Sequence, residues 1–262
     1  MGQVITASGL AIGVDEAGGG DAPPIVFLHG VGSDKSVWAP QLEHFGQSRR
    51  ALAFDYPGYG ESDPAPPRTT RDDFAAAMLA AMDALGIRDA HVCGLSLGGV
   101  IAIAMHERLP NRCRSLILAD TFAVHPDGAA IYDRSVAASE SMAELAAART
   151  PALLAPGASE ALHQEVRETM ARIDPDAFRI GAKAVWLADQ RDRVGKISVS
   201  TLVIVGDQDT ITPTELSEDL VERIAGAEFQ ILAGAGHLAN IERPGDFNVA
   251  VDRFIEGVEA QG

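Results

Sequence analysis

The chain has 262 residues, of which 47% are hydrophobic and 22% are charged, a composition that is typical of a folded globular protein and excludes intrinsic disorder. Its formal net charge of −16 at pH 7 makes nucleic acid and anionic membrane surfaces unsuitable partners. No apolar run approaches the roughly 20 residues of a transmembrane helix. The two cysteines, Cys93 and Cys113, stand in or beside apolar runs. They predict buried thiols rather than a disulfide or a metal site, and therefore a reducing, cytoplasmic compartment.

Short apolar runs alternate with longer helical patterns along most of the chain. This alternation predicts an α/β fold with a mostly parallel twisted sheet and helices on both faces. A hairpin is expected over residues 3–15. The predicted strands of the sheet are residues 25–28, 51–54, 91–94, 115–119, 202–205 and 229–232.

Three helices are predicted between or after these strands. Apolar residues recur at helical spacing after Thr70 and Asp73, which form a capping-box pattern. A second helix is expected over residues 97–109, where Pro110 ends it. Phe247 and Val251 mark a closing helix near the C-terminus.

Residues 122–196 break the alternation. They are rich in Ala, Glu and Arg and predict several short helices without a convincing strand. An all-helical insertion between two strands of one sheet is typical of a cap rather than of a separate domain. We therefore expect a core domain of residues 1–121 and 197–262, and a helical cap over residues 122–196.

The segment Gly94-Leu95-Ser96-Leu97-Gly98 is a G-x-S-x-G motif between a predicted strand and a predicted helix. The motif needs this context, because the serine must occupy a strained turn at the carboxyl end of the strand. Ser96 is therefore the predicted nucleophile. The amide of Leu97 begins the helix without an intrahelical partner and can bind an oxyanion.

A second glycine-rich segment, His29-Gly30-Val31-Gly32-Ser33, follows the strand over residues 25–28. In folds of this kind such a loop supplies the other oxyanion donor, and the backbone N–H of Val31 is the predicted one. Only backbone needs to act here, so the His29 side chain is interpreted as structural.

Two late loops contain the candidate acid and base. Asp207 and Asp209 follow the strand over residues 202–205, and both are candidates for the acid. His237 lies after the last strand and next to Gly236, which favours it over the other histidines as the base. The order Ser, Asp, His differs from the orders of trypsin-like and subtilisin-like enzymes.

Acyl transfer explains these motifs together. A serine hydroxyl is a weak nucleophile, so an imidazole must take its proton and a carboxylate must orient that imidazole. Water then resolves the acyl-enzyme. This chemistry requires no cofactor and no metal, and we expect neither.

The chain resembles the α/β-hydrolase family over nearly its whole length. The resemblance lies in "FLHGVGSD", "FDYPGYGESD", "GLSLGG", "TLVIVGDQDTITP" and "GAGHLANIERP". It implies an α/β-hydrolase fold, with the catalytic acid at Asp209 rather than Asp207. Serine at position 96 argues against the relatives that use an aspartate nucleophile.

Within this family the chain is most similar to 3-oxoadipate enol-lactonases. That likeness implies a small ester or lactone substrate with a free carboxylate, which Arg134 in the cap is predicted to bind in preference to Arg149 or Arg172. Tyr132 and Trp186 are the other predicted substrate-binding residues. The cap lacks the tryptophan that these lactonases carry in its first helix and their later arginine–tryptophan–phenylalanine run, and this leaves the natural substrate open.

Two alternatives to an esterase or lactonase remain. The same triad can hydrolyse a carbon–carbon bond of a diketone or carry out perhydrolysis. A ligand-sensing protein can also keep the fold and turn over slowly. The sequence does not specify the oligomeric state.

Overall fold

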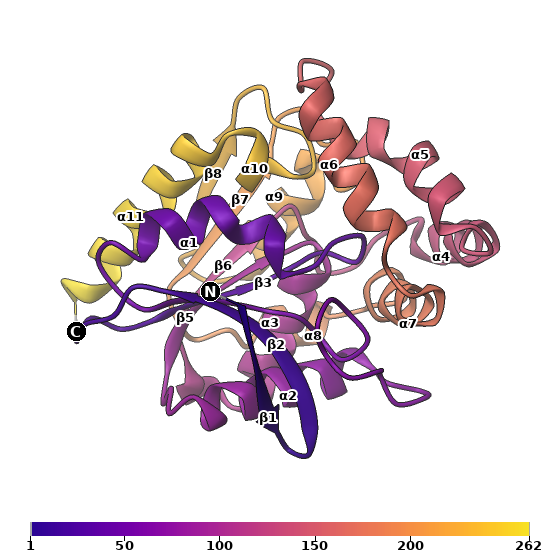
Figure 1. Ribbon diagram of the computed structural model, residues 1–262. Helices are drawn as coiled ribbons and strands as arrows, with labels where there is room; N and C mark the ends of the chain where they lie inside the picture. The colour runs from indigo at the N-terminus through magenta and orange to yellow at the C-terminus, as the bar shows by residue number, and fades with distance from the viewer. Residues whose placement is uncertain (1, 262) are drawn as a thin grey trace.

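The computed structural model describes residues 2–261; Met1 and Gly262, the outer ends of the predicted core segments, lie outside the described residues. Within this range, eight strands form one sheet in the order β1-β2-β4-β3-β5-β6-β7-β8 (Figure 1). β2 runs antiparallel to β1 and β4, and all other pairs are parallel. The strands are Gly2–Ala7 (β1), Leu10–Ala17 (β2), Ile25–Leu28 (β3), Ala51–Phe54 (β4), Ala90–Leu95 (β5), Cys113–Ala119 (β6), Thr201–Gly206 (β7) and Glu228–Leu232 (β8). The predicted mostly parallel sheet with a leading hairpin is confirmed.

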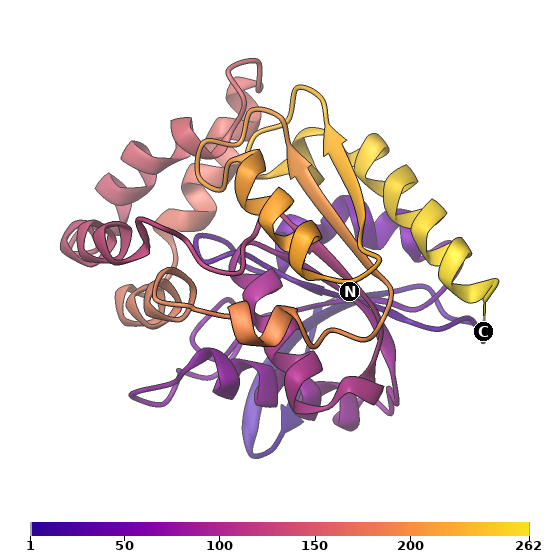
Figure 2. The same cartoon turned by 180° about the vertical axis from the view of Figure 1, so that it is seen from behind.

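Helices cover both faces of the sheet. α1 and α11 pack against each other on one face, while α2, α3, α8 and α9 lie on the other, where Figure 2 shows α9 beside β7. The bounds are Ala39–Phe45 (α1), Arg71–Ala84 (α2), Leu97–Arg108 (α3), Arg191–Val194 (α8), Thr214–Arg223 (α9), Ala239–Glu242 (α10) and Pro244–Glu259 (α11), with two 3-10 turns, Lys35–Trp38 (η1) and Pro110–Arg112 (η2). Among these residues and the rest of the described chain, no helix is long and apolar enough to cross a membrane.

Local sequence signals explain how two of these helices begin and end. The Thr70 hydroxyl accepts from the N–H of Asp73, and the Asp73 carboxylate accepts from the N–H of Thr70 at 2.8 Å. This reciprocal pair is the predicted capping box, and it satisfies donors that the first turn of α2 leaves free. α3 ends at Arg108, directly before Leu109 and Pro110, because proline restricts the residue before it to extended backbone.

Between β6 and β7 the described chain forms further helices. They are Gly128–Ala138 (α4), Met142–Leu153 (α5), Glu160–Ala171 (α6), Pro175–Trp186 (α7) and the short α8. α4 to α7 lie together at one side of the sheet in both views (Figures 1 and 2). α4 packs on α7, α5 on α6, and α7 contacts α3 of the core.

The buried apolar residues form a continuous core that joins both faces of the sheet to this helical layer. β3, β4, β5 and β7 are buried along their whole length, as expected for parallel strands that are covered on both faces. Parallel strands place their carboxyl ends at one edge of a sheet, and in open α/β sheets ligands bind at that edge. The loops after β3, β5, β7 and β8 all meet there.

Candidate active site

Ser96 occupies the sharp turn between β5 and α3. Its backbone has φ 55° and ψ −113°, a strained conformation for a residue with a side chain. A Cβ at Gly94 would overlap the carbonyl of Gly98, and a Cβ at Gly98 would overlap the carbonyl of Leu28. The two glycines are therefore required where the backbone crosses itself, and they hold Ser96 at the carboxyl edge of the sheet.

The loop after β3 lies against this turn. A Cβ built on Gly30 would be 3.5 Å from the Cβ of Ser96, so the backbone next to Val31 directly faces the serine. Leu97 is the first residue of α3, where backbone N–H groups have no acceptor within the helix. Val31 follows a residue that approaches Ser96, and Leu97 follows Ser96 at the start of α3, so both backbone N–H groups remain the predicted oxyanion donors.

The His29 side chain is buried beneath this loop rather than directed to a reactive group. Its Nδ1 lies 2.8 Å from the carbonyl oxygen of Gly30, and the Tyr56 hydroxyl donates to the carbonyl of His29 at 3.0 Å. Burial lowers the pKa of His29, which favours the neutral imidazole. These contacts agree with a structural role.

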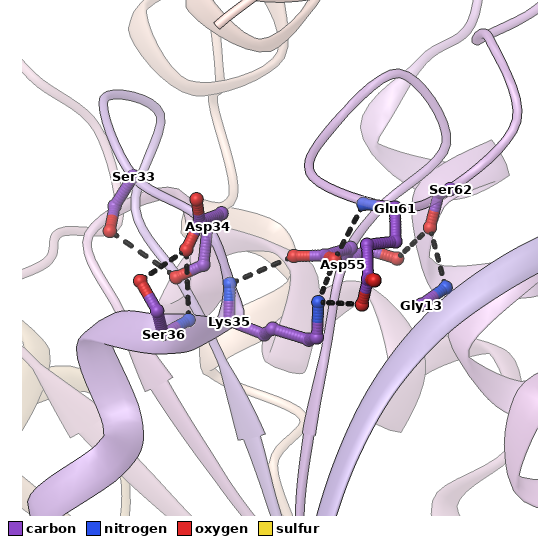
Figure 3. Close-up of polar contacts among 8 residues, drawn as sticks. All are labelled: Gly13, Ser33, Asp34, Lys35, Ser36, Asp55, Glu61 and Ser62. Atoms are coloured by element: carbon purple, nitrogen blue, oxygen red, sulfur yellow. Dashed lines mark hydrogen bonds and ion pairs between the residues drawn. The ribbon is translucent and has the colours of Figure 1, made fainter. Parts of the chain in front are cut away.

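An ionic cluster of the buried Lys35 and Asp55 and the exposed Glu61 fixes the same loop to the segment after β4 (Figure 3). Lys35 Nζ lies 2.7 Å from Asp55 Oδ2 and 2.7 Å from Glu61 Oε2, and the backbone N–H of Lys35 donates to Asp55 Oδ1 at 2.8 Å. Burial alone would lower the pKa of Lys35, but the hydrogen bonds to Asp55 and Glu61 outweigh it and raise that pKa. The lysine therefore stays charged and keeps the loop in place.

Asp209 and His237 are in contact, and His237 lines the same cavity as Ser96. Asp209 Oδ2 is 2.8 Å from His237 Nδ1, and both side chains are buried. The second carboxylate oxygen accepts from the backbone N–H of Ile211 at 2.7 Å and from that of Thr212 at 3.0 Å. The Thr212 hydroxyl donates to Oδ2 at 2.5 Å and lies 3.2 Å from His237 Nδ1. Thr212 therefore contacts both Asp209 and His237, which the sequence did not indicate.

These contacts decide the charge of Asp209. Burial alone would raise its pKa, but the charge of His237 and the hydrogen bonds from His237 and Thr212 lower it further than burial raises it. Asp209 is therefore a carboxylate that accepts from the imidazole. Asp207 instead accepts from the backbone N–H of Gly234 at 2.7 Å, which is a turn contact.

Ser96 and His237 line one cavity of about 40 Å³. Its walls come from the loop after β3, from α5 and α6, and from the end of α7. The residues that line it are Gly30, Val31, Gly32, Ser33, Ser36, Val37, Ser96, Arg149, Leu153, Glu165, Val166, Thr169, Met170, Trp186, His237, Leu238 and Ile241. This space is smaller than the roughly 150 Å³ of a cavity that binds benzene, so a substrate must extend beyond it.

A second cavity, of about 650 Å³, adjoins the first. Arg149 and Trp186 line both, so they form the partition between the two spaces. Arg134 lines only the outer cavity and is exposed, while Tyr132 is half-buried and lines neither. Of the three predicted substrate-binding residues, only Trp186 lies against the cavity of Ser96.

Arg149 is a charged residue of this partition, and the sequence-based prediction had favoured Arg134 over it for binding a carboxylate. Its Nη1 donates to Ser135 Oγ at 3.1 Å, and its guanidinium lies 5.9 Å from the centre of the Trp186 ring. Within the described chain it has no ion pair with an acid, and burial lowers its pKa to about 10. Trp186 is buried, and its Nε1 has no hydrogen-bond partner among the described residues. Among the described residues, Trp186 Nε1 and the guanidinium nitrogens of Arg149 other than Nη1 thus have no hydrogen-bond acceptor.

Comparison with known proteins agrees with this geometry. A model for the alpha/beta hydrolase family matches residues 25–250. 3-Oxoadipate enol-lactonase 1 of Acinetobacter baylyi is 28% identical over 98% of this chain and 97% of its own length. 2-Hydroxymuconate semialdehyde hydrolase of Pseudomonas sp. is 28% identical over 99% of this chain and 95% of its own length. The enol-lactonase structure from Burkholderia xenovorans LB400 has a TM-score of 0.91 at 28% identity, covering 97% of this chain and 100% of that one. The predicted fold and family resemblance are confirmed.

Proposed function

The chain belongs to the α/β hydrolase family, and we propose that it is a serine hydrolase that cleaves a carboxylic ester or lactone through an acyl-enzyme on Ser96. One observation carries the proposal. The buried hydrogen bond between Asp209 and His237 adjoins the same small cavity as the strained serine. Strained backbone and buried charge are costly, and such features cluster at reactive sites.

In the proposed reaction, His237 takes the proton of Ser96 as the serine oxygen attacks the acyl carbon. Its Nδ1 is engaged by Asp209, so Nε2 is the nitrogen left for this transfer. The carbon–oxygen bond to the alcohol then breaks, and the imidazolium gives the proton to the leaving oxygen. Water attacks the acyl-enzyme by the same route and releases the acid.

The backbone N–H groups of Val31 and Leu97 are the proposed donors to the oxyanion. Each such donor is worth about 3–4 kcal/mol of transition-state stabilisation. The Lys35–Asp55 ion pair supports this role, because it removes freedom from the loop that carries Val31. A preorganised donor pays no reorganisation cost during the reaction.

We propose that residues 122–196 act as a cap. Helices α5, α6 and α7 supply Arg149, Leu153, Val166, Met170 and Trp186 to the cavity of Ser96. A cover of this kind excludes water and shapes the substrate. Because it leaves little space beside Ser96, the larger part of a substrate is proposed to extend past Arg149 and Trp186 into the outer cavity.

The resemblance to enol-lactonases implies a substrate with a carboxylate, and Arg149 is the better placed arginine to bind it. Arg149 reaches the cavity of Ser96, whereas Arg134 does not. A guanidinium binds a carboxylate through two parallel hydrogen bonds. Among the described residues, the one acid that lines the inner cavity is the exposed Glu165, so the carboxylate of a substrate faces little repulsion there.

A substrate panel of p-nitrophenyl acetate, lactones with and without a carboxylate, and a diketone tests this function. We expect turnover of the esters and lactones, and a loss in Ser96→Ala of about a millionfold, the cost of removing such a nucleophile. Exclusive turnover of the diketone would replace the proposal with carbon–carbon hydrolysis. A ligand-dependent thermal shift without any turnover would identify a ligand-sensing protein.

A further inference from the structure

The start of the connection between α5 and α6 is attached to the loop that carries His237. The backbone N–H of His237 donates to the carbonyl of Leu153 at 3.0 Å. The N–H of Ala155 donates to Glu242 Oε2 at 2.7 Å, and the N–H of Gly236 donates to Glu242 Oε1 at 2.9 Å. A single carboxylate therefore joins the residue before His237 to the helical cover.

The two segments are in close contact, with no space between them. A Cβ on Gly236 would lie 2.6 Å from the backbone nitrogen of Ala155 and 3.0 Å from Glu242 Oε1. On the acid side, the Thr210 hydroxyl donates to the carbonyl of Ala152 at 3.3 Å. Residues 152–155, where the cover joins these loops, thus contact both loops that hold the Asp209–His237 pair.

α6 carries this connection across the site. It follows the attached segment and supplies Val166, Thr169 and Met170 to the cavity of Ser96. At its far end, the methyl carbon of Met170 lies 2.5 Å from the position that a Cβ of Gly32 would occupy. The attached segment and α6 together therefore span from the loop of His237 to the loop of Val31, one of the two proposed oxyanion donors.

We propose that Glu242 is a positioning residue that holds the loop of His237 and the segment that precedes α6 in a fixed arrangement beside the cavity of Ser96. It does not line the cavity, so it acts through these two segments rather than on the substrate. The proposal rests on the proposed function, since it assigns a role relative to the base of that mechanism.

The chemistry of the contacts explains why a carboxylate stands here. Glu242 accepts from the backbone N–H groups of Ala155 and Gly236, one at each oxygen, and a carboxylate is an acceptor at both oxygens. An amide of the same shape accepts at only one, and its NH₂ group would face an N–H donor. Glu259 provides the contrast, because it is bonded to Arg49 and His91 at the opposite end of the sheet.

The test compares Glu242→Gln, Glu242→Ala and Ala155→Pro with the matched control Glu259→Gln. Proline removes the donor on the cover side and places its ring where that N–H points to Glu242, so this variant separates the two segments. Leu154 already has extended backbone, φ −116° and ψ 148°, that is allowed before proline. For each variant, kcat, KM, the melting temperature and the rate of labelling by a fluorophosphonate are measured on the folded protein.

We expect Glu242→Gln to lower kcat at least tenfold and to slow labelling in parallel, because both depend on His237. Ala155→Pro should raise KM in addition to lowering kcat, since it detaches from Glu242 the cover that lines the cavity. Glu259→Gln should lower the melting temperature without changing kcat.

Unchanged kcat and labelling in Glu242→Ala would overturn the proposal, as would losses in Glu242→Gln that only follow a lowered melting temperature. A wild-type protein that neither labels nor turns over would overturn the proposed function and this role together. Activity in the wild type that Glu242→Ala leaves intact would overturn the role alone.

Discussion

The two ends of the central sheet differ in how their buried polar groups are paired. At the amino end, His91 Nδ1 lies 2.8 Å from Ser115 Oγ and its Nε2 lies 3.2 Å from Glu259 Oε1. Arg49 completes the group with an ion pair to Glu259 at 2.6 Å. Arg49 and Glu259 carry opposite charges and pair with each other. The cluster connects the end of α11 to β5 and β6.

At the carboxyl end the same sheet keeps strained and unpaired groups. Ser96 has φ 55° and the buried Asp120 has φ 46°, while Arg149 lacks an acidic partner and Trp186 Nε1 lacks an acceptor in the described chain. Burial also raises the pKa of Asp120 far above its usual value. The difference teaches that the amino end pairs its buried charges, whereas the carboxyl end, where we propose the active site, retains strained and unpaired groups that cost stability.

The largest effect expected at the carboxyl end, short of removing the serine, is that of Asp209→Asn. Asparagine keeps the shape but favours the wrong imidazole tautomer and removes the charge that stabilises imidazolium, which costs about 10⁴-fold in kcat in a related triad. Asp207→Asn is the matched control and should cost little, since its contact is a turn contact. Steady-state kinetics on one ester decide between them, and the reverse ranking would transfer the role to Asp207.

A smaller and selective effect is expected at the partition between the cavities. Arg149→Ala should lower kcat/KM for a carboxylate-bearing lactone by about 1.5–3 kcal/mol, the range for a charge-assisted hydrogen bond, and leave a neutral ester nearly unchanged. Arg134→Ala is the control, because Arg134 lines only the outer cavity. Equal losses on both substrates would indicate damaged packing, and a selective loss only in Arg134→Ala would restore the arginine predicted from sequence.

The smallest effect on activity and the clearest effect on stability are expected at the amino end. Burial lowers the pKa of His91 to about 4, whereas an unfolded imidazole titrates near about 6.5. Between these values the unfolded chain binds more protons, so stability is lost as pH falls from about 6.5 to 4, by about 3 kcal/mol at most.

Urea unfolding of the wild type and of His91→Gln at a series of pH values measures this contribution. The variant should lose less stability on acidification than the wild type, and its kcat above pH 6.5 should match the wild type. Parallel stability profiles for the two proteins would contradict the account of His91.

The parts of the fold that depend on local sequence could be predicted. β3 and β4 have the expected bounds because each is a run of four buried apolar residues. The capping box before α2 and the G-x-S-x-G turn are signals within a few residues of one another. The Asp209–His237 contact joins residues 28 apart, and the family resemblance guided that pairing.

The parts that depend on packing between distant helices could not be predicted. Arg149 and Arg134 are both cap arginines in sequence, and only the packing of α5 against α4 and α6 directs one of them to the inner cavity. The contact of Glu242 with Ala155 likewise spans 87 positions, so no local sequence signal indicates it. Tyr132 is the opposite case. Its place in the sequence of α4 predicted contact with the substrate, but it lines neither cavity.

Reaction of the wild-type protein with a fluorophosphonate tests the central claim most directly, because the reagent needs an activated serine and no knowledge of the substrate. We predict one adduct per chain by intact mass, located on the peptide of Ser96, and its loss in Ser96→Ala with the melting temperature retained. No adduct, or an adduct on Ser33 at the rim of the same cavity, would contradict the assignment of Ser96 as the nucleophile.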